Sequence, residues 1–331
     1  MSDLALDKQR PRGSVLVPAE ESSFDSPDVV GVATVRVRTS FLSQLAGVVA
    51  VAGPPIGILS AMGVLWGVAF STLDLVLLLV LYVLSGLGIT AGWHRYFSHR
   101  SFETSRPMQA VLAVLGSIAM QGPLTQWVTD HRKHHALSDQ EGDPHSPHAG
   151  RDPGVRGRLS GLLHAHVGWL FTTKGLERGP HYARDLYADR MIVWIDRLYL
   201  VWIALSVGIP FAIGFAFGGL DAGLQAMVWA GLIRIFAFQH ATFAINSICH
   251  AFGNRAYRSR DESRNVWLLA PLSFGESWHN NHHAFPASAR HGLDRFQLDL
   301  AWFTIRGLEL CGLVRDVKRP SVAQRSRRSV D

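Results

Sequence analysis

Four long apolar stretches alternate with polar blocks along the chain and predict its architecture. Each stretch is long enough to cross the roughly 30 Å hydrocarbon core of a bilayer as a helix. The first two stretches are separated by a short polar break around Ser71, and the last two by a glycine-rich turn that holds Asp221. We therefore predict an all-α integral membrane protein with four transmembrane helices in two hairpins, over residues 41–66, 72–92, 191–217 and 222–248.

The polar blocks define the remaining organisation. The first 35 residues are rich in Ser, Pro and acidic residues and lack the apolar core of a signal peptide, which predicts a disordered cytosolic tail over 1–35. Lys and Arg lie almost entirely in the polar blocks and are absent from both hairpin turns, so the positive-inside rule places both termini and these blocks in the cytoplasm. We predict a membrane domain over 36–315, a cytosolic helical cap within it formed by 93–190 and 249–315, and a basic C-terminal tail over 316–331.

Composition narrows the functional class. The chain of 331 residues is 48% hydrophobic although 18% of its residues are charged, which is typical of charge segregated from apolar blocks. Its net charge of +6 follows the membrane orientation, so we predict no nucleic-acid partner. The two cysteines, Cys249 and Cys311, are far apart, which argues against an iron–sulfur cluster, a cysteine zinc site or a disulfide framework.

Histidines form three short boxes, each next to an apolar segment. Imidazole is the commonest side-chain metal ligand, and eight imidazoles are too many for one ion but suit two. In an H-x-x-H-H box, residues i, i+3 and i+4 share one helix face, so each such box can direct several nitrogens to one place. An i, i+5 pair does not share a face on a regular helix and fits a site where a helix ends. The boxes are His94 and His99; His131, His134 and His135; and His279, His282 and His283.

Further ligands are expected at the end of the fourth stretch and around the boxes. Asn246 and His250 are four residues apart and share the face that meets the cap, so His250 is a candidate ninth imidazole and Asn246 a ligand through water. Metal-bound imidazoles usually donate their second N–H to a carboxylate, and several acids lie near the boxes. Those that we assign to this supporting role are Asp130, Asp143 and Glu276.

The absence of a carboxylate box separates this pattern from soluble di-iron bundles, and a closed zinc site needs far fewer residues. Two iron ions in a nitrogen-rich site at a membrane favour O2 activation on an apolar substrate, because an unactivated C–H bond offers no acid, base or leaving group. Hydroxylation of an alkane or other lipid uses the same chemistry, and a metal-binding membrane protein without redox activity is a further alternative.

Several motifs together resemble the membrane fatty-acid desaturase family, and within it the Δ9, stearoyl-CoA-desaturase-like branch. The resemblance covers roughly residues 75–315 and rests on segments 87–99, 130–135, 143–145, 166–169, 246–250 and 276–286. It implies four membrane helices, a cytosolic cap and O2-dependent removal of two hydrogens from a long acyl chain, to give a cis double bond near Δ9. It also implies a non-haem di-iron centre with the nine histidines as ligands and Asn246 bound through water.

The substrate and the electron donor are less defined by the resemblance. Animal relatives hold the CoA head with polar and basic cap residues, whereas the matching stretches here are mostly neutral apart from Lys174, which leaves CoA, a glycerolipid or a carrier protein as the acyl carrier. Electrons are expected from a separate protein of the ferredoxin or cytochrome b5 type, with its reductase. The candidate substrate residues are Lys174, Trp169 and, for the closed end of an acyl tunnel with core packing as the alternative, Tyr82 and Leu78.

Overall fold

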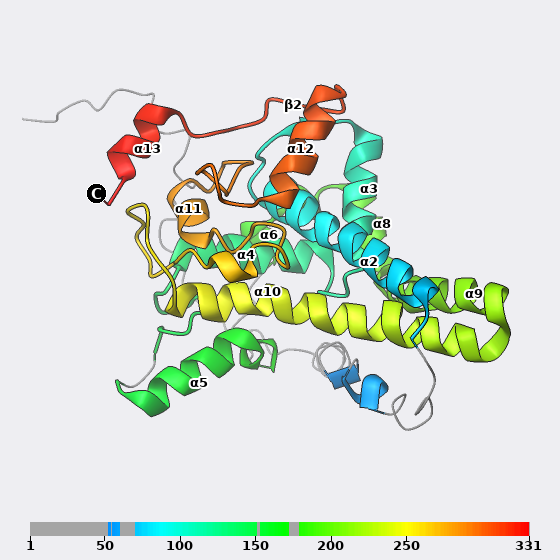
Figure 1. Ribbon diagram of the computed structural model, residues 1–331. Coiled ribbons are helices and arrows are strands. Elements are labelled where there is room, and N and C mark those ends of the chain that lie inside the picture. The colour runs from blue at the N-terminus through cyan, green and yellow to red at the C-terminus, as the bar shows by residue number, and fades with distance from the viewer. Residues whose placement is uncertain (1–51, 54, 60–69, 151–152, 172–178, 331) are drawn as a thin grey trace, which may run out of the picture.

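The protein is almost entirely helical in its computed structural model, which describes residues 52–53, 55–59, 70–150, 153–171 and 179–330 (Figure 1). The predicted tail 1–35, Lys174 and all of the predicted span 41–66 except a few residues lie outside this description. The described strands are β1 (Glu103–Thr104) and β2 (Val314–Arg315), which pair antiparallel and connect the cap to the C-terminal segment.

The second predicted span is a helix that runs further than its apolar stretch. Helix α2 (Thr72–Leu87) starts at a capping box in which the Ser71 hydroxyl and the Asp74 carboxylate satisfy each other's backbone N–H groups. It continues without a break as the π-helix η2 (Gly88–Ser98). The apolar side chains of α2 are largely exposed, for example Leu79 and Val80 at 53% and 49%, as expected for a surface that faces lipid.

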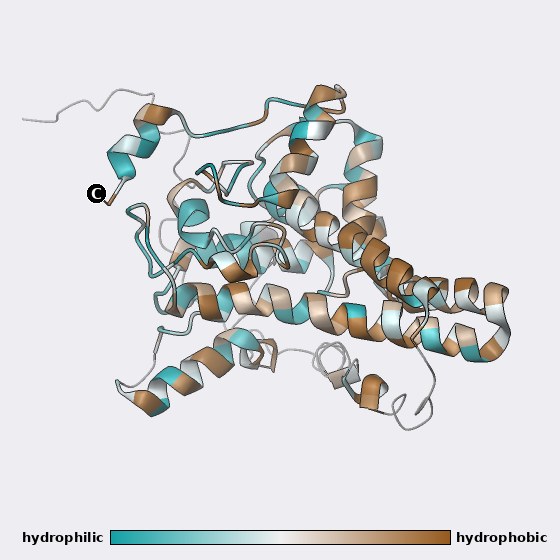
Figure 2. Ribbon diagram, viewed as in Figure 1, coloured by the Kyte–Doolittle hydropathy of each residue, from teal (hydrophilic) through white to brown (hydrophobic). Residues whose placement is uncertain are grey.

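The last two predicted spans form a folded-back pair of helices. Helix α9 (Tyr199–Ala226) contains non-helical backbone at Gly218 and Gly219, after which the chain returns alongside its first arm through η5 (Met227–Ile233) and α10 (Arg234–Ala251) (Figure 1). Thr72–Ser98 and Tyr199–Ala251 are the two described helical segments that are long and apolar enough to cross a membrane. Figure 2 shows the apolar residues concentrated along these elements and the polar ones in the cap.

The long helix in the third predicted span, 191–217, begins later than residue 191. Residues Arg190–Arg197 form a separate helix, α8, which Asp189 caps at its start and which ends at Leu198. Its Asp196 carboxylate accepts hydrogen bonds from the backbone N–H groups of Leu124 and Thr125, at 2.8 and 3.1 Å. The helix α8 is thus held against α4, and the described helical segment of membrane-spanning length starts at Tyr199.

The cap packs around the histidine boxes. Its buried core includes Trp93, Phe102, Leu124, Ile192 and Ile305. Its further helices are α3 (Arg106–Ser117), α4 (Leu124–Leu137), α5 (Val155–His166), η3 (Gly168–Phe171), α6 (Gly179–Tyr182), α7 (Arg184–Tyr187), η6 (Trp267–Leu269), α11 (His279–Ala284), α12 (Leu300–Leu310) and α13 (Val322–Arg328).

The backbones of helix α3 and of η2 pack directly against each other. A Cβ added to Gly88 would lie 2.2 Å from the backbone nitrogen of Gly116, and a Cβ added to Gly116 would lie 2.1 Å from Trp93 Nε1. Both positions therefore require glycine. This contact fixes the helix that carries the first histidine box against the rest of the cap.

Candidate metal centre

The first box lies at the end of the π-helix η2, whose C-cap residue is His99, as the i, i+5 spacing predicted. The N–H group of His99 donates to the carbonyl of His94, five residues earlier, at 3.2 Å. This i→i+5 winding widens each turn, so that side chains five residues apart come closer to one face than on an α-helix. The two imidazoles therefore lie together, with ring centroids 4.9 Å apart. The helix end was predicted from the i, i+5 spacing, and the π-helical winding that precedes it was not.

Five imidazoles converge in one group, the five-histidine cluster. One nitrogen from each ring lies within 4.8 Å of the others. His94 Nε2 faces His282 Nε2 at 3.0 Å, and His282 Nε2 also faces His135 Nε2 at 2.8 Å. The members come from η2, α4 and α11 or adjoin them, and they are His94, His99, His131, His135 and His282.

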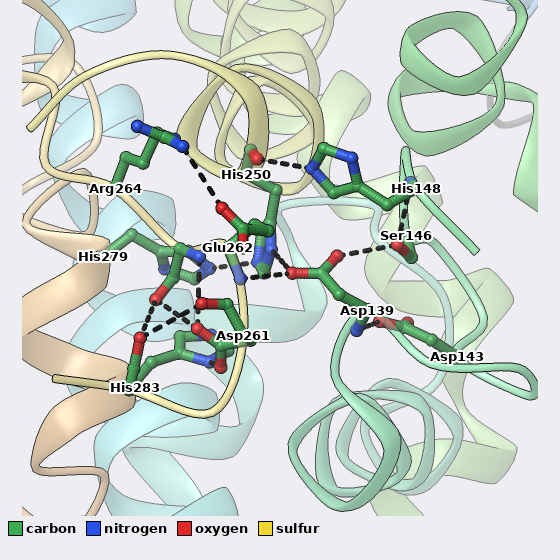
Figure 3. Close-up of polar contacts among 12 residues, drawn as sticks. Asp139, Asp143, Ser146, His148, His250, Asp261, Glu262, Arg264, His279 and His283 are labelled. Atoms are coloured by element: carbon green, nitrogen blue, oxygen red, sulfur yellow. Dashed lines mark hydrogen bonds and ion pairs between the residues drawn. The ribbon is translucent and has the colours of Figure 1, made fainter. Parts of the chain in front are cut away.

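The other four predicted imidazoles form a second group, the four-histidine cluster, by the same distance criterion. His134 Nε2 faces His283 Nε2 at 3.3 Å, and His250 Nε2 faces His279 Nε2 at 3.0 Å. Helix α10 contributes His250, and Figure 3 shows this residue beside His279 and His283 of α11. All nine predicted histidines are thus brought together, in two groups.

Each H-x-x-H-H box is divided between the two clusters. In α4, His131 and His135 join the five-histidine cluster and His134 joins the other. In α11, His279 and His283 join the four-histidine cluster, and His282 joins the five-histidine cluster. The i, i+4 pair of each box therefore serves one centre and the i+3 residue serves the other, which corrects the expectation that a box points to a single place.

Carboxylates fix the outer nitrogens of the four-histidine cluster. The Nδ1 atom of His134 lies 2.9 Å from Asp143, that of His250 lies 2.9 Å from Asp139, and that of His283 lies 2.5 Å from Asp261. An ionised carboxylate only accepts hydrogen bonds, so each Nδ1 carries the proton and each Nε2 presents a lone pair inward. Burial raises the pKa of the three Asp carboxyls, but the neighbouring imidazoles lower it further, to well below the ordinary value.

In the five-histidine cluster, Glu276 has the same role. Its carboxylate contacts His94 Nδ1 and also accepts from the guanidinium of Arg95 at 3.1 Å. Arg95 is fully buried and is held in turn by Asp299, at 2.8 Å. Burial opposes the charged form of Glu276, but His94, His291 and Arg95 hold its pKa well below the usual range.

The imidazole nitrogens of both clusters are placed as metal ligands would be. Two lone pairs facing each other at about 3 Å repel, as at His134 and His283, unless a cation lies between them. With metal–nitrogen distances of about 2.1 Å, neighbouring ligand nitrogens lie about 3.0 to 3.4 Å apart, and the facing Nε2 atoms are 2.7 to 3.3 Å apart. Burial also lowers the pKa of most rings, including His99, His131, His135, His279 and His282, and so favours the neutral form that binds metal.

The remaining predicted site residues are placed as follows. Asn246 lines a cavity together with His134 and His279 and is half-buried. Asp130 accepts hydrogen bonds from Gln126 Nε2 at 3.0 and 3.1 Å and, among the described residues, contacts no imidazole of either cluster. Burial raises the pKa of Asp130 to about 7. Its position in sequence next to His131 did not indicate a contact, because adjacent residues on a helix point to different faces.

The candidate substrate residues lie at some distance from the clusters. Trp169 packs against His145, with ring centroids 5.3 Å apart, and is not among the residues that line the described cavity. Tyr82 donates a hydrogen bond to the Leu272 carbonyl at 2.8 Å and packs against Phe238, which does line the cavity. Leu78 is partly exposed on α2, one turn from Tyr82.

Several residues that support the clusters were not predicted from the sequence. Asp261 lies 22 residues before His283 and in no recognisable pattern with it. Asp139 was one of several acids after the second box, and sequence had no means of selecting it. His291 is fully buried, with its Nδ1 3.4 Å from Glu276, and His145 packs on His134 with centroids 4.4 Å apart. These contacts join segments that are distant along the chain, and only the fold brings them together.

A cavity lies between the clusters and the helices. Its apolar lining includes Ile89, Phe238 and Ile245, and its polar lining includes Thr90 and Thr242. Four imidazoles from both clusters also border it: His94, His131, His134 and His279. An apolar chain in this cavity would lie beside both metal centres. The fold and the site therefore define a helical protein with two apolar helical segments of membrane-spanning length and two adjacent histidine clusters whose nitrogens suit metal binding.

Comparison with known proteins identifies the family. The family model described as "Fatty acid desaturase" matches residues 70–306. A hex-5-enoyl-[acyl-carrier protein] acetylenase of Moorena producens (strain JHB) is 44% identical over 81% of this chain and 84% of its own. Delta-9 acyl-lipid desaturase 1 of Arabidopsis thaliana is 40% identical over 75% and 76%. An sn-1 stearoyl-lipid 9-desaturase of Synechocystis sp. (strain ATCC 27184 / PCC 6803 / Kazusa) is 38% identical over 73% and 70%.

The chain belongs to the fatty acid desaturase family. It is an oxidoreductase that acts on fatty acyl chains, and its similarity lies with the Δ9 branch, as the motifs predicted.

Proposed function

We propose that the protein is an O2-dependent Δ9 desaturase that inserts a cis double bond into a long saturated acyl chain esterified to a membrane lipid. The observation that supports this most directly is the pair of interlocked histidine clusters bordering one partly apolar cavity. The acyl-lipid carrier is supported by the names of two relatives and by the mostly neutral residues where animal relatives hold CoA.

The nine histidines would hold two iron ions, with Asn246 contributing through water. Bound iron with O2 would supply the oxidising power that an unactivated methylene requires. Overall, one CH2–CH2 unit, one O2, two electrons and two protons give one CH=CH unit and two waters. Imidazole also binds zinc, copper and nickel, so the choice of iron rests on the family and on this chemistry.

The protein's own residues would position the substrate and shield the site. Methylene groups of one chain are chemically alike, so the double-bond position depends on which pair the cavity holds beside the clusters. Ile89, Phe238 and Ile245 would contact the chain and exclude water. The Asp and Glu partners would keep each Nδ1 protonated and each Nε2 directed to the metal.

We further propose a four-span topology. The spans would be 41–66, Thr72–Ser98 and the two arms of Tyr199–Ala251, with both termini and the metal centres in the cytoplasm. The absence of Lys and Arg around the Gly218–Gly219 turn and their abundance in the cap support this orientation. Reporter fusions at the turn and after residue 331 would report opposite sides of the membrane; the same side would contradict it.

A fatty-acid profile of membranes from an expressing host tests the reaction. Gas chromatography–mass spectrometry with derivatisation that locates double bonds should show a new Δ9 monounsaturated acid, two mass units below its parent. The acid should be absent with His283→Ala. A product heavier by one oxygen would instead indicate a hydroxylase, and an unchanged profile with an electron donor supplied would contradict the proposal.

A second reaction is favoured by one relative. The Moorena producens protein is named an acetylenase of a hex-5-enoyl chain on acyl-carrier protein. Removal of two hydrogens from an existing double bond is the same net chemistry applied to an alkene. Supplying the host with hex-5-enoic acid and screening for an alkyne would distinguish the two activities.

A further inference from the structure

Helix α8 presents two arginines and a tryptophan on one side, at the point where the long helix α9 begins. Arg190, Trp194 and Arg197 follow the i, i+4, i+7 spacing of a single helix face, and all three are exposed. The other side of α8 buries Ile192 and Ile195 in the core of the cap. We call the exposed side, formed by the two arginines and the tryptophan, the arginine–tryptophan face.

The two arginines of this face have no acidic partner within the part of the chain that the structure describes. The acids of α8 and of the segment before it are engaged by other groups. Asp189 pairs with Arg106 on α3, and Asp185 on α7 pairs with Arg132 at 2.7 Å. Asp196 accepts hydrogen bonds from two backbone N–H groups of α4, at 2.8 and 3.1 Å. Because guanidinium groups remain charged at every physiological pH, the face keeps two uncompensated positive charges.

The face is continuous with an exposed aliphatic surface. The Arg197 guanidinium lies over the Trp194 ring, 5.1 Å from its centroid, as in a cation–π pair. Directly beyond this pair, Leu198, Leu200 and Val201 are exposed at 41%, 76% and 46%. Tryptophan and arginine beside such a surface are typical of the depth of the lipid headgroups, where a side chain has apolar surroundings on one side and polar ones on the other.

We propose that the arginine–tryptophan face binds the headgroup of an anionic phospholipid in the cytoplasmic leaflet. A guanidinium group can donate two parallel hydrogen bonds to phosphate oxygens, and the indole would pack against the glycerol and the first methylenes. The choline of a zwitterionic lipid cancels the phosphate charge, so a face with two cations favours a lipid of net negative charge.

This lipid would be distinct from the proposed substrate, because none of the three residues lines the described cavity. The proposal rests on the proposed topology, in which a span starts at Tyr199 and α8 lies at the cytoplasmic surface of the membrane.

Neutralisation of the two arginines tests the site. Arg190→Gln/Arg197→Gln removes two exposed charges from α8, and Arg156→Gln/Arg158→Gln removes two exposed charges from α5 as the matched control. Native mass spectrometry of the full-length protein in a non-ionic detergent would measure the binding of phosphatidylglycerol and of phosphatidylcholine. We expect the wild type and the α5 variant to prefer phosphatidylglycerol. The α8 variant should bind it about 10- to 30-fold more weakly, because each basic residue contributes about fivefold, and should bind phosphatidylcholine as before.

Three results would overturn the site: equal phosphatidylglycerol affinity in the α8 variant and the wild type, an equal loss in the α5 variant, or no preference for phosphatidylglycerol in the wild type. Competition with inorganic phosphate separates a lipid from a free anion. Displacement of phosphatidylglycerol by phosphate at physiological concentration would assign the face to the free anion and contradict the proposal. The reporter fusions test the topology independently, because lipid binding in detergent does not depend on which leaflet is cytoplasmic.

Discussion

The two histidine clusters differ in how their imidazoles are supported. In the four-histidine cluster, three of four rings donate Nδ1–H to an Asp carboxylate. In the five-histidine cluster, among the described residues, only His94 has a carboxylate partner, Glu276, which Arg95 and Asp299 hold in place. A carboxylate partner raises the basicity of an imidazole ligand. The four-histidine cluster thus has fewer but more basic imidazole donors. The five-histidine cluster has more imidazoles and depends on one carboxylate, Glu276.

The clusters are nevertheless interlocked. Helices α4 and α11 each supply two imidazoles to one cluster and one to the other, in opposite senses. A shift of either helix therefore changes both centres at once. Differences in support between the two centres are best measured with single substitutions that leave the helices in place.

Removal of one imidazole from either cluster should have the largest effect. His135→Ala and His279→Ala should each lose about one of two bound metals and reduce desaturation by more than the roughly 100-fold expected for an outer partner, because an inner nitrogen is lost. Metal per chain by mass spectrometry and the product by gas chromatography would measure both. His181→Ala, an exposed histidine outside the clusters, is the control. Retention of both metals in either variant would refute the ligand assignment.

Glu276→Gln should come next. Within the part of the chain that the structure describes, it removes the one carboxylate that contacts the five-histidine cluster, and it leaves Arg95 with Asp299 as its acidic partner. We expect about 100-fold weaker metal binding at that centre. Titration with a chelator should then show two well-separated steps of metal release. A single step of metal release, at the same chelator concentration as in the wild type, would mean that Glu276 does not support the five-histidine cluster.

Asp139→Asn should have a smaller effect. His250 loses its charged partner, but Asp143 and Asp261 continue to support His134 and His283. We expect about 10-fold weaker binding at the four-histidine cluster, at the low end of the range for such partners. The same chelator titration measures it. A loss as large as that of Glu276→Gln would show that the two centres do not differ in the way described.

Asp130→Asn should leave metal content unchanged. This carboxylate contacts Gln126 and no described imidazole of the clusters, despite its position next to His131. Metal analysis beside Asp143→Asn, which removes a contact to His134, provides the comparison. Metal loss in Asp130→Asn equal to that in Asp143→Asn would restore the supporting role that sequence alone assigned to Asp130.

Local patterns determined much of this protein. The apolar stretches predicted the two described membrane-length helical segments, and the three boxes together with His250 predicted nine imidazoles that the structure does bring together. The motifs around these histidines together resembled the desaturase family, and the family match confirms this. These features are readable because helix periodicity and ligand chemistry depend on residues only a few positions apart.

The features that local sequence patterns did not predict depend on the tertiary structure. The π-helical winding before His99, the end of α8 at Arg197 and the division of each box between two clusters depend on what packs against each helix. Asp261 and Glu276 support His283 and His94 across 22 and 182 residues of chain. Contacts at such separations leave no periodic trace in a sequence, since they exist only once burial and packing have brought distant segments together.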